Sequence, residues 1–300
     1  MKFIDAHKGR FGVAPICRVL SEHAIRIAPS TYYDAKARPV SARSLRDADL
    51  QVEIARVHGQ NYGVYGPRKV WLQLNREGIA VARCTVERLM KFLGLQGIRR
   101  GKKWKTTVAD PTAARPADLV RRKFNPLAPN VLWVADFTYV TSWAGVVYVA
   151  FVIDAYARRI LGWRAATSMH TELVLDAIDQ AVWVRRREGV TSFPGLVHHT
   201  DAGSQYTSIA FTERLADIGV TPSIGTVGDA YDNALAETVI GLYKAELINL
   251  NRPWKTADQL EIATLHYVDW FNNRRLYEEN GDLPPVELEH AYYRQHRPSA

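Results

Sequence analysis

The sequence predicts an α/β protein in which an all-α region precedes a mixed β-sheet. Three observations support this. The front of the chain repeats apolar residues at helical spacing, the stretch 131–167 is rich in β-branched and aromatic residues, and helical and strand patterns then alternate. The 300 residues and the 47% hydrophobic content suffice for about two domains with buried cores.

Composition argues against several classes of protein. The longest apolar run, Val146 to Ile153, has 8 residues, whereas a membrane helix needs about 20. The charged start of the chain lacks the apolar stretch of a signal peptide. Cys17 and Cys84 stand 67 positions apart without neighbouring Cys or His ligands, so neither a disulfide framework nor a structural zinc site is indicated. We expect a cytoplasmic protein with no membrane partner.

Positive charge is concentrated at the front. Residues 1–124 carry 25 Lys and Arg against 10 Asp and Glu, a net charge of +15, and residues 125–300 carry 14 against 21, a net charge of −7. Lysine and arginine that neutralise phosphates release counterions, so a basic region of this size favours binding to nucleic acid. A merely solvated basic surface is the alternative.

Residues 1–40 form an N-terminal helical segment that resembles a helix-turn-helix. Its two short helical patterns cover about residues 15–20 and 30–36, and Ser30 is the expected N-cap of the second.

A clearer helix-turn-helix domain occupies residues 41–100. Its pattern predicts a helix near 45–58, a turn at GQNYGVYG, a helix over 68–76 that Pro67 opens, and a third helix over 85–93. The third helix places Val86, Leu89, Met90 and Leu93 inward and Arg83, Glu87, Arg88 and Lys91 outward. A basic last helix suits the major groove of DNA, and an ordinary three-helix packing unit is the alternative.

Residues 101–128 are predicted to be a basic linker. The segment at the end of the helical domain and the start of the linker supplies further candidate DNA-binding residues: Arg99, Arg100, Lys102, Lys103 and Lys105. They fit an extended arm along a DNA backbone, and a passive linker fits equally well.

Residues 129–250 are predicted to be the catalytic core. Three strand patterns joined by short turns require antiparallel neighbours, and helical and strand patterns then alternate through the helix expected at 233–249. The resulting order, β-β-β-α-β-α-β-α, is that of the ribonuclease H-like fold. Residues 251–300 are expected to form a C-terminal helical extension.

Three carboxylates are the candidate catalytic and metal-binding residues. Asp136 interrupts a strand face that is otherwise apolar, Asp201 follows the strand that ends at His199, and Glu237 shares a helix face with Gly241 and Lys244. Each also has an ordinary structural interpretation: a salt-bridged Asp, a turn Asp and a solvated surface Glu. An oxygen-only ligand set selects Mg²⁺ or Mn²⁺, and two such ions can act on a phosphodiester.

Other polar residues near these carboxylates are expected to be structural. His198 and His199 are adjacent in a strand and point to opposite faces, so they are not expected to share a ligand role. Asp154 lies in a hairpin turn and is expected to be structural rather than a fourth ligand. Arg185 to Arg187 end a helix and are expected to form a solvated face.

The motifs resemble a known family. Asp136, Asp201 and Glu237 occur in that order with 35 residues between the last two, within WVADFTYV, HHTDAGSQY and GDAYDNALAE, and Lys244 follows seven residues after the glutamate. This pattern closely resembles the DDE transposases of the insertion-sequence three family, specifically their second-frame (OrfB) product. YGVYGPRKVWLQL and CTVERLMKFLGL resemble the helix-turn-helix of that family, and VDWFNNRRL resembles its C-terminal helix.

The resemblance implies a bacterial transposase with an integrase catalytic core, which binds the terminal inverted repeats of its element and target DNA. It implies that two Mg²⁺ ions, for which Mn²⁺ can substitute, support DNA cleavage and strand transfer. It also places Lys244 at DNA near the scissile phosphate. It also implies a copy-out route through a circular intermediate, a homo-oligomer on nucleoid DNA, and an upstream first-frame (OrfA) product as a partner.

Two departures and two alternative functions stand beside this resemblance. Ala202 replaces a long polar residue that relatives often have, which leaves a local DNA contact in doubt, and Tyr277 replaces a common histidine. A ribonuclease H-like nuclease would cleave without joining. A domesticated DNA-binding regulator would have lost a carboxylate, and all three are present.

Overall fold

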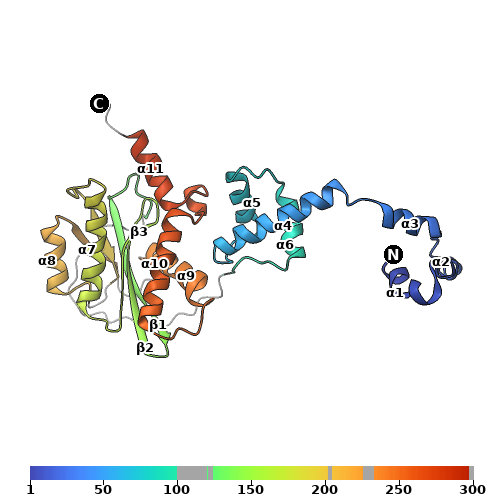
Figure 1. Ribbon diagram of the computed structural model, residues 1–300. Helices are drawn as coiled ribbons and strands as arrows, with labels where there is room; N and C mark the ends of the chain where they lie inside the picture. The colour runs from blue at the N-terminus through green and yellow to red at the C-terminus, as the bar shows by residue number, and fades with distance from the viewer. Residues whose placement is uncertain (100–119, 121–123, 202–204, 226–232, 297–300) are drawn as a thin grey trace. The chain divides into compact units, whose positions relative to one another are not determined.

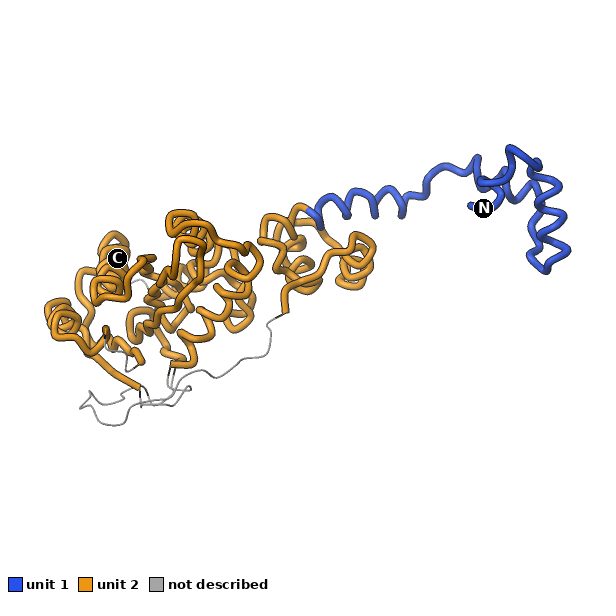
Figure 2. Tube along the Cα trace, turned by 90° about the horizontal axis from the view of Figure 1, so that it is seen from below, with its two compact units in different colours: residues 1–55 blue, residues 56–300 orange. Residues whose placement is uncertain are grey.

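The computed structural model of the protein describes residues 1–99, 120, 124–201, 205–225 and 233–296. The chain divides into two compact units, residues 1–55 and residues 56–300 (Figure 2). Helix α4, Ala42–Gln60, runs across the boundary between them. None of the helices in the described ranges is long and apolar enough to cross a membrane.

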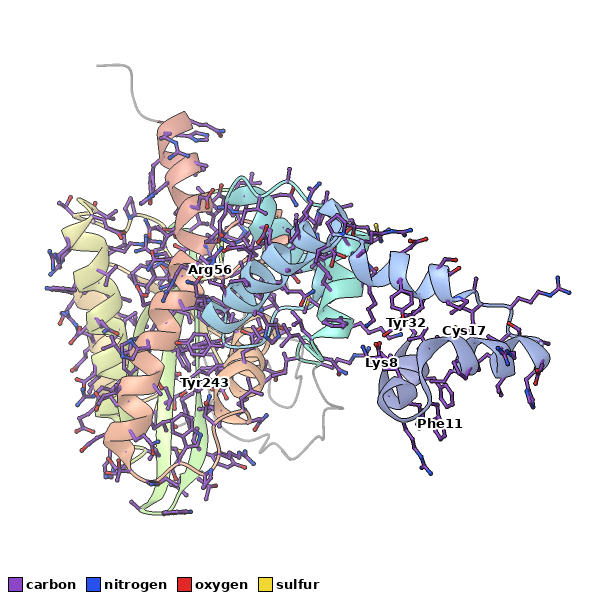
Figure 3. The ribbon with its side chains drawn as sticks, turned by 45° about the vertical axis from the view of Figure 1, so that its right-hand side comes forward. Lys8, Phe11, Cys17, Tyr32, Arg56 and Tyr243 are labelled. Atoms are coloured by element: carbon purple, nitrogen blue, oxygen red, sulfur yellow. The ribbon has the colours of Figure 1, made fainter. Side chains whose placement is uncertain are left out.

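The N-terminal unit contains three helices, α1 (Lys2–Phe11), α2 (Val13–Glu22) and α3 (Pro29–Ala37), followed by the start of α4. Gly12, with a φ of 76°, separates α1 from α2, and this left-handed conformation favours glycine. A small core of Ile4, Val13, Ile16, Cys17 and Tyr32 holds the helices together, and Figure 3 labels two of these residues.

Two details of this unit differ from the sequence prediction. Helix α1 was not expected, because only one of its residues, Ile4, is buried and the apolar pattern is weak. The expected N-cap at Ser30 is wrong: α3 begins at Pro29 and its N-cap residue is Ala28. Proline fits the first turn of a helix because its missing N–H would have no partner there.

The helix-turn-helix region has its helices where the sequence placed them. Helix α4 is followed by α5 (Pro67–Arg76) and α6 (Arg83–Phe92). Val86, Leu89 and Met90 of α6 are buried, whereas Leu93 lies past the end of the helix and is half-buried. Gly97 is close to Gly66: a Cβ on Gly97 would lie 2.4 Å from the backbone nitrogen of Gly66, so a larger residue does not fit.

A five-stranded mixed sheet forms the centre of the second unit. Its strands lie in the order β3-β2-β1-β4-β5. β1 pairs antiparallel with β2, β2 pairs antiparallel with β3, and β4 and β5 continue the sheet in parallel. This confirms the predicted ribonuclease H-like order, with bounds β1 Leu132–Ser142, β2 Gly145–Asp154, β3 Arg159–Ala166, β4 Val197–Thr200 and β5 Thr221–Ile224.

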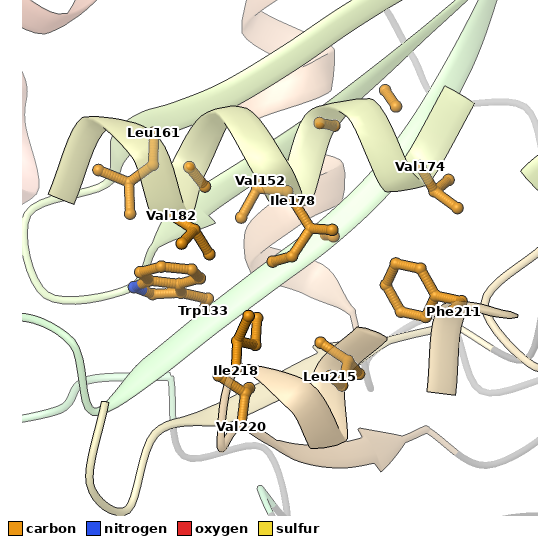
Figure 4. Close-up of a cluster of buried hydrophobic side chains, with 14 of the residues drawn as sticks. Trp133, Val152, Leu161, Val174, Ile178, Val182, Phe211, Leu215, Ile218 and Val220 are labelled. Carbon is orange, nitrogen blue, oxygen red and sulfur yellow. The ribbon is translucent and has the colours of Figure 1, made fainter. Parts of the chain in front are cut away.

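Helices α7 (Thr171–Arg187) and α8 (Ile209–Asp217) cover one face of the sheet. Trp133, Val152, Ile178 and Phe211 belong to the buried cluster on this side (Figure 4). A Cβ on Gly162 of β3 would lie 2.0 Å from the main-chain oxygen of a residue in α7. Only glycine therefore allows α7 to approach the sheet this closely.

Helices α9 (Ala234–Tyr243) and α10 (Ala257–Asn273) lie on the opposite face (Figure 1). The rings of Phe151 in β2 and Tyr243 in α9 are 5.0 Å apart. Asn272 of α10 exchanges two hydrogen bonds with the backbone of Ile160 in β3, at 2.9 and 2.8 Å. The face that carries Asp136 is therefore the face that these two helices cover.

The predicted single helix over 233–249 is interrupted. After Tyr243 the helix changes to a π-helical turn, Lys244–Ile248, in which the main-chain N–H of Asn249 donates to the oxygen of Lys244. A short 3-10 helix, Glu278–Asn280, and α11, Pro285–Gln295, complete the C-terminal extension.

The expected solvated face at the end of α7 is wrong for Arg185. Its side chain is fully buried and forms ion pairs with Asp154 and Glu289, whereas Arg186 and Arg187 are exposed as expected. Asp154 also accepts hydrogen bonds from the backbone of Asn130 and Tyr156. The prediction that Asp154 is structural is thus confirmed.

Candidate active site

Asp136 and Asp201 lie beside each other because a short strand ends next to a long one. β4 is 4 residues long, and its last residue, Thr200, pairs with Ala135 of β1. Asp201 follows directly after β4, level with Asp136. Asp136 lies within β1 rather than at its end, since β1 continues to Ser142 beyond the end of β4.

Glu237 is brought to the same place by the start of α9. The side-chain amide of Asn233, at the N-cap position, donates to the main-chain oxygen of Ala135 at 3.0 Å. Leu235, Ala236, Val239 and Ile240 of α9 are buried, which leaves Glu237 half-buried in the first turn. This polar contact and the apolar helix face fix the start of α9, which carries Glu237, relative to β1.

Asp136 lies within the electrostatic influence of both other carboxylates. Burial and the charge of Asp201 raise the pKa of Asp136 to about 8, with a further contribution from Glu237. A hydrogen bond from the Phe137 N–H at 2.8 Å and the charge of Lys244 act in the opposite direction. Like charges this close favour protonation or a compensating cation.

Lys244 completes this group from the end of α9. It is half-buried, and its ammonium lies 5.4 Å from the centre of the Tyr139 ring. Burial lowers the pKa of Lys244, the charge of Asp136 raises it, and the charge of Arg252 lowers it. Arg252, an exposed residue, is a basic neighbour that the sequence analysis did not identify.

Tyr206 is a second neighbour that the sequence analysis missed. Its hydroxyl is buried and has no hydrogen-bond partner in the described part of the chain. Burial and the charges of Asp136 and Asp201 raise the pKa of this phenol well above its usual value. Its ring lies 6.1 Å from that of Phe137. Its place at the end of HHTDAGSQY was the only signal available in the sequence.

The two histidines of this motif lie on different faces of the sheet. His198 packs against Phe211 of α8 at 5.5 Å, and burial lowers the pKa of its ring to about 3. His199 contacts Ser223 of β5, with 2.9 Å between Nδ1 and Oγ. The prediction that they do not share a ligand role is consistent with this separation.

The donor chemistry of the site fits a hard divalent cation. Two aspartates and one glutamate supply only oxygen, which suits Mg²⁺ or Mn²⁺. Within the described ranges, no three His, Cys, Asp or Glu side chains are gathered closely enough to hold one ion. Ala202, one of the two departures from the family pattern, lies outside the described residues, whereas Tyr277 is buried against Phe271.

The candidate DNA-binding residues of α6 are exposed. Arg83, Arg88 and Lys91 lie on its outer face, and Arg83 pairs with Glu87 at 2.9 Å. Arg99, just after the helix, is also exposed. The remaining candidates lie outside the described residues: Arg100, Lys102, Lys103 and Lys105.

Protein-family models match most of the chain. Two models described as Integrase core domain match residues 126–230 and 218–285. A model described as HTH-like domain matches residues 44–103. The matched ranges contain all three carboxylates, Lys244 and the exposed residues of α6.

Curated relatives align with nearly the full chain. The transposase named for insertion sequence element IS986/IS6110 of Mycobacterium tuberculosis H37Rv is 65% identical over 275 residues, 91% of this chain and 99% of that protein. The transposase for insertion sequence element IS629 of Shigella sonnei is 51% identical over 298 residues, 98% and 96% of the two chains. Among solved structures, the HTLV-2 integrase catalytic core in complex with magnesium aligns with a TM-score of 0.42 and 18% identity, covering 55% of this chain and 99% of that one.

Proposed function

The chain belongs to the insertion-sequence transposases that combine a helix-turn-helix region with an integrase core, and from this membership we propose that Asp136, Asp201 and Glu237 perform DNA cleavage and strand transfer at the ends of its element. The observation that carries the proposal is geometric: β4 ends beside Ala135, so that Asp201 lies level with Asp136, and Asn233 binds the start of the Glu237 helix to Ala135 at 3.0 Å. Asp201 and Glu237 both raise the pKa of the Asp136 carboxyl, and Lys244 opposes them. Three acidic groups and one lysine, drawn from β1, the end of β4 and α9, supply the carboxylate ligands and the positive charge that phosphodiester chemistry uses.

The three carboxylates would hold divalent cations, Mg²⁺ or Mn²⁺, two in number. When bound, such ions activate an attacking oxygen and stabilise the leaving oxygen of a phosphodiester. The protein's own residues supply the placement. Asn233 orients the helix that carries Glu237, and Lys244 binds the phosphate beside the scissile bond.

The reaction proposed here has two displacements. In the first, water attacks phosphorus, the bond from phosphorus to the 3′ oxygen breaks, and a free 3′ hydroxyl remains at the element end. In the second, that hydroxyl attacks a phosphodiester of another DNA segment and displaces its 3′ oxygen. No covalent bond between protein and DNA is needed.

Affinity for DNA is proposed to come from the basic front of the chain. The exposed face of α6 enters the major groove of the terminal repeats, and the basic residues that follow contact the backbone. The protein would act as a homo-oligomer on nucleoid DNA in the cytoplasm, together with the first-frame (OrfA) product, and would proceed through a circular intermediate.

The test uses isosteric variants of the full-length chain. Asp136→Asn, Asp201→Asn and Glu237→Gln should each abolish nicking of an element end and joining of a precleaved end in Mg²⁺. Their affinity for the same duplex should remain within about twofold of the wild type, because phosphate contacts outside the site supply it. Glu213→Gln, on an exposed position of α8, is the control.

The outcomes separate the alternatives. Normal strand transfer by any of the three variants would remove that residue from the site. Nicking without joining by the wild type would indicate a nuclease, and DNA binding without either reaction would indicate a regulator.

A further inference from the structure

The turn before α5 packs against the end of α10. Trp270 of α10 donates from its indole nitrogen to the side-chain oxygen of Asn61 at 2.9 Å, and its ring lies 5.0 Å from that of Tyr62. Tyr65 is 1% exposed, with its ring 6.2 Å from Trp270. The helix-turn-helix region is therefore attached to the C-terminal extension of the core through a buried aromatic cluster.

Ion pairs extend this contact along α5. Arg68 forms two hydrogen bonds to Asp282, at 2.9 and 2.6 Å, and Arg76 pairs with Glu287 at 2.6 Å. Such partly exposed pairs add little stability, but their geometry restricts how α5 can turn on the core.

Helix α6 is fixed to the same turn. The main-chain N–H of Ile98, after α6, donates to the oxygen of Val64 at 3.0 Å. The indole of Trp71 in α5 donates to the oxygen of Val81 at 2.8 Å, just before α6 begins. A movement of residues 61–66 would therefore also move α6, the proposed DNA-binding helix.

A buried ion pair continues from this contact toward the active site. Arg275 makes two hydrogen bonds to Glu246, at 2.8 and 2.6 Å, and both side chains are 5% exposed. The Tyr267 hydroxyl donates to the same carboxylate at 3.1 Å. The guanidinium lies 5.3 and 5.1 Å from the ring centres of Phe271 and Tyr277, so its charge is enclosed on several sides.

One hydroxyl joins this ion pair to the helix-turn-helix region. The oxygen of Tyr65 accepts a hydrogen bond at 2.7 Å from the main-chain N–H of Leu276, the residue after Arg275. Glu246, at the other end of the ion pair, lies in the π-helical turn that begins at Lys244. A continuous path of short contacts thus runs from Tyr65 through Arg275 and Glu246 to the end of the helix that bears Glu237.

The charges of this pair are poorly explained by stability alone. Removing two charges from water is costly, and apolar residues of similar volume often hold such a position equally well. A bidentate pair instead fixes a geometry, because its two parallel hydrogen bonds define both distance and orientation. π-helical turns within α-helices frequently occur at functional sites.

We propose that Glu246 and Arg275 are positioning residues, which together with Tyr65 hold the helix-turn-helix region and the Glu237–Lys244 helix at a fixed spacing. The distance along the DNA between the recognised sequence and the cleaved phosphodiester is set by this spacing. The inference rests on the proposed function, because it assumes that α6 binds the element end and that Glu237 acts on it.

The test compares two tyrosine hydroxyls in the full-length chain. Tyr65→Phe removes the acceptor of the Leu276 N–H. Tyr243→Phe, the control, removes an equally buried hydroxyl on α9 that bonds to Thr264 of α10, at 2.7 Å. For each variant, affinity for a duplex element end, the rate of joining of a precleaved end at saturating DNA, and the nucleotide position of the nick are measured.

Tyr65→Phe should bind the end as the wild type does, join it about tenfold more slowly and nick at neighbouring phosphodiesters as well, since a misplacement of about 1 Å can lower a rate ~100-fold. Arg275→Lys should behave in the same way, because lysine keeps the charge but loses the paired hydrogen bonds. Tyr243→Phe should match the wild type. Wild-type rates and a single nick position in both Tyr65→Phe and Arg275→Lys would overturn the inference.

A second measurement does not depend on catalysis. In the DNA-free chain, Tyr65→Phe should accelerate amide hydrogen exchange in residues 244–248, while residues 174–182 of α7 serve as an internal reference. If the wild type itself joins no DNA, the proposed function fails, and the exchange experiment still decides this inference. Unchanged exchange in residues 244–248 would contradict it.

Discussion

The side-chain amide of Asn233 donates a hydrogen bond to the main-chain oxygen of Ala135, with 3.0 Å between the two atoms. Ala135 directly precedes Asp136 in β1, and Asn233 directly precedes the helix that carries Glu237. Asn233 is buried, so water does not compete for the contact. This single bond relates the strand carboxylate to the helix carboxylate within the protein itself.

Asn233→Ala is expected to impair catalysis more than DNA binding. The Ala135 oxygen would lose its side-chain donor, at a stability loss of about 1–3 kcal/mol, and α9 would be free to shift relative to β1. Joining of a precleaved end should fall about tenfold or more, because small misplacements of catalytic groups are costly. Asn273→Ala, which removes an exposed amide on α10 that bonds within its own helix, is the control. Equal rates for the two variants would show that the bond has no positioning role.

Lys244→Ala is expected to stop the placement of the DNA end. If Lys244 binds the phosphate beside the scissile bond, its loss should lower joining about 100-fold while end affinity stays nearly normal. Lys244→Arg should restore only part of the rate, because a planar guanidinium does not replace a compact ammonium. Lys255→Ala is a matched control, since Lys255 also lies over an aromatic ring, at 5.9 Å from the centre of Trp143. Rates at saturating Mg²⁺ decide the result, and an unchanged rate for Lys244→Ala would assign it to the solvated surface.

The order of strands and helices could be predicted because it depends on local patterns. Short turns force antiparallel pairing, and strand patterns separated by helices produce the parallel strands. The relative lengths of paired strands are not local. The sequence places Asp201 after a strand, but only the register shows that β4 stops beside Ala135, so that Asp136 meets Asp201 in the middle of β1.

Contacts that form between distant segments could not be predicted. Arg185 sits in an Arg-Arg-Arg run that is typical of a solvated helix end, yet Glu289, 104 residues later, pairs with it in the core. Arg252 joins the site through folding alone. The π-helical turn at Lys244 contains Glu246, whose partner Arg275 lies 29 residues later, a contact that no local pattern indicates.

Helix α6 offers a direct test of DNA binding through a cysteine. Cys84 is exposed on this helix and Cys17 is buried, so a thiol reagent applied to the folded chain should report mainly on Cys84. Duplex element ends should slow this reaction, and Lys91→Ala should weaken the protection and make its salt dependence shallower. Lys255→Ala, at an exposed position outside the basic front, is the control. Reaction at the same rate with and without DNA would argue against α6 as the contact surface.

The pH dependence of stability should reveal the buried carboxylate of Glu289. Burial raises its pKa, but hydrogen bonds and charge from Arg185 more than offset this and hold the pKa below the ordinary 4.5. A carboxyl with a lowered pKa in the folded state stabilises the protein above its unfolded-state pKa, and this contribution is lost as the pH falls through the folded-state value. The difference in unfolding free energy between the wild type and Glu289→Gln should therefore be largest at neutral pH and shrink in acid. Burial raises the pKa of Asp154, so the contribution of Asp154 to stability has the opposite pH dependence. The wild type is therefore compared with Glu289→Gln, in which Asp154 is retained. A difference that grows in acid would contradict the assignment.

Arg185 provides the most demanding test of how the C-terminal extension is held to the core. Its guanidinium contacts Asp154 at 2.9 Å and Glu289 at 2.7 Å, and all three side chains are fully buried. Arg185→Leu would leave the buried Asp154 without its Arg185 counter-charge and Glu289 with Arg159, at 2.7 Å, as its remaining ion pair. Removal of one partner from a buried pair costs about 3–5 kcal/mol. Arg186→Leu, at the adjacent exposed position, should change stability by no more than about 0.5 kcal/mol. Arg185→Lys should fall between them, because an ammonium keeps the charge but cannot bridge both carboxylates with a planar fork. Urea unfolding at neutral pH measures the free energy of unfolding of all three variants. Equal stability of Arg185→Leu and Arg186→Leu would mean that apolar contacts hold α11 and that this charge cluster is dispensable.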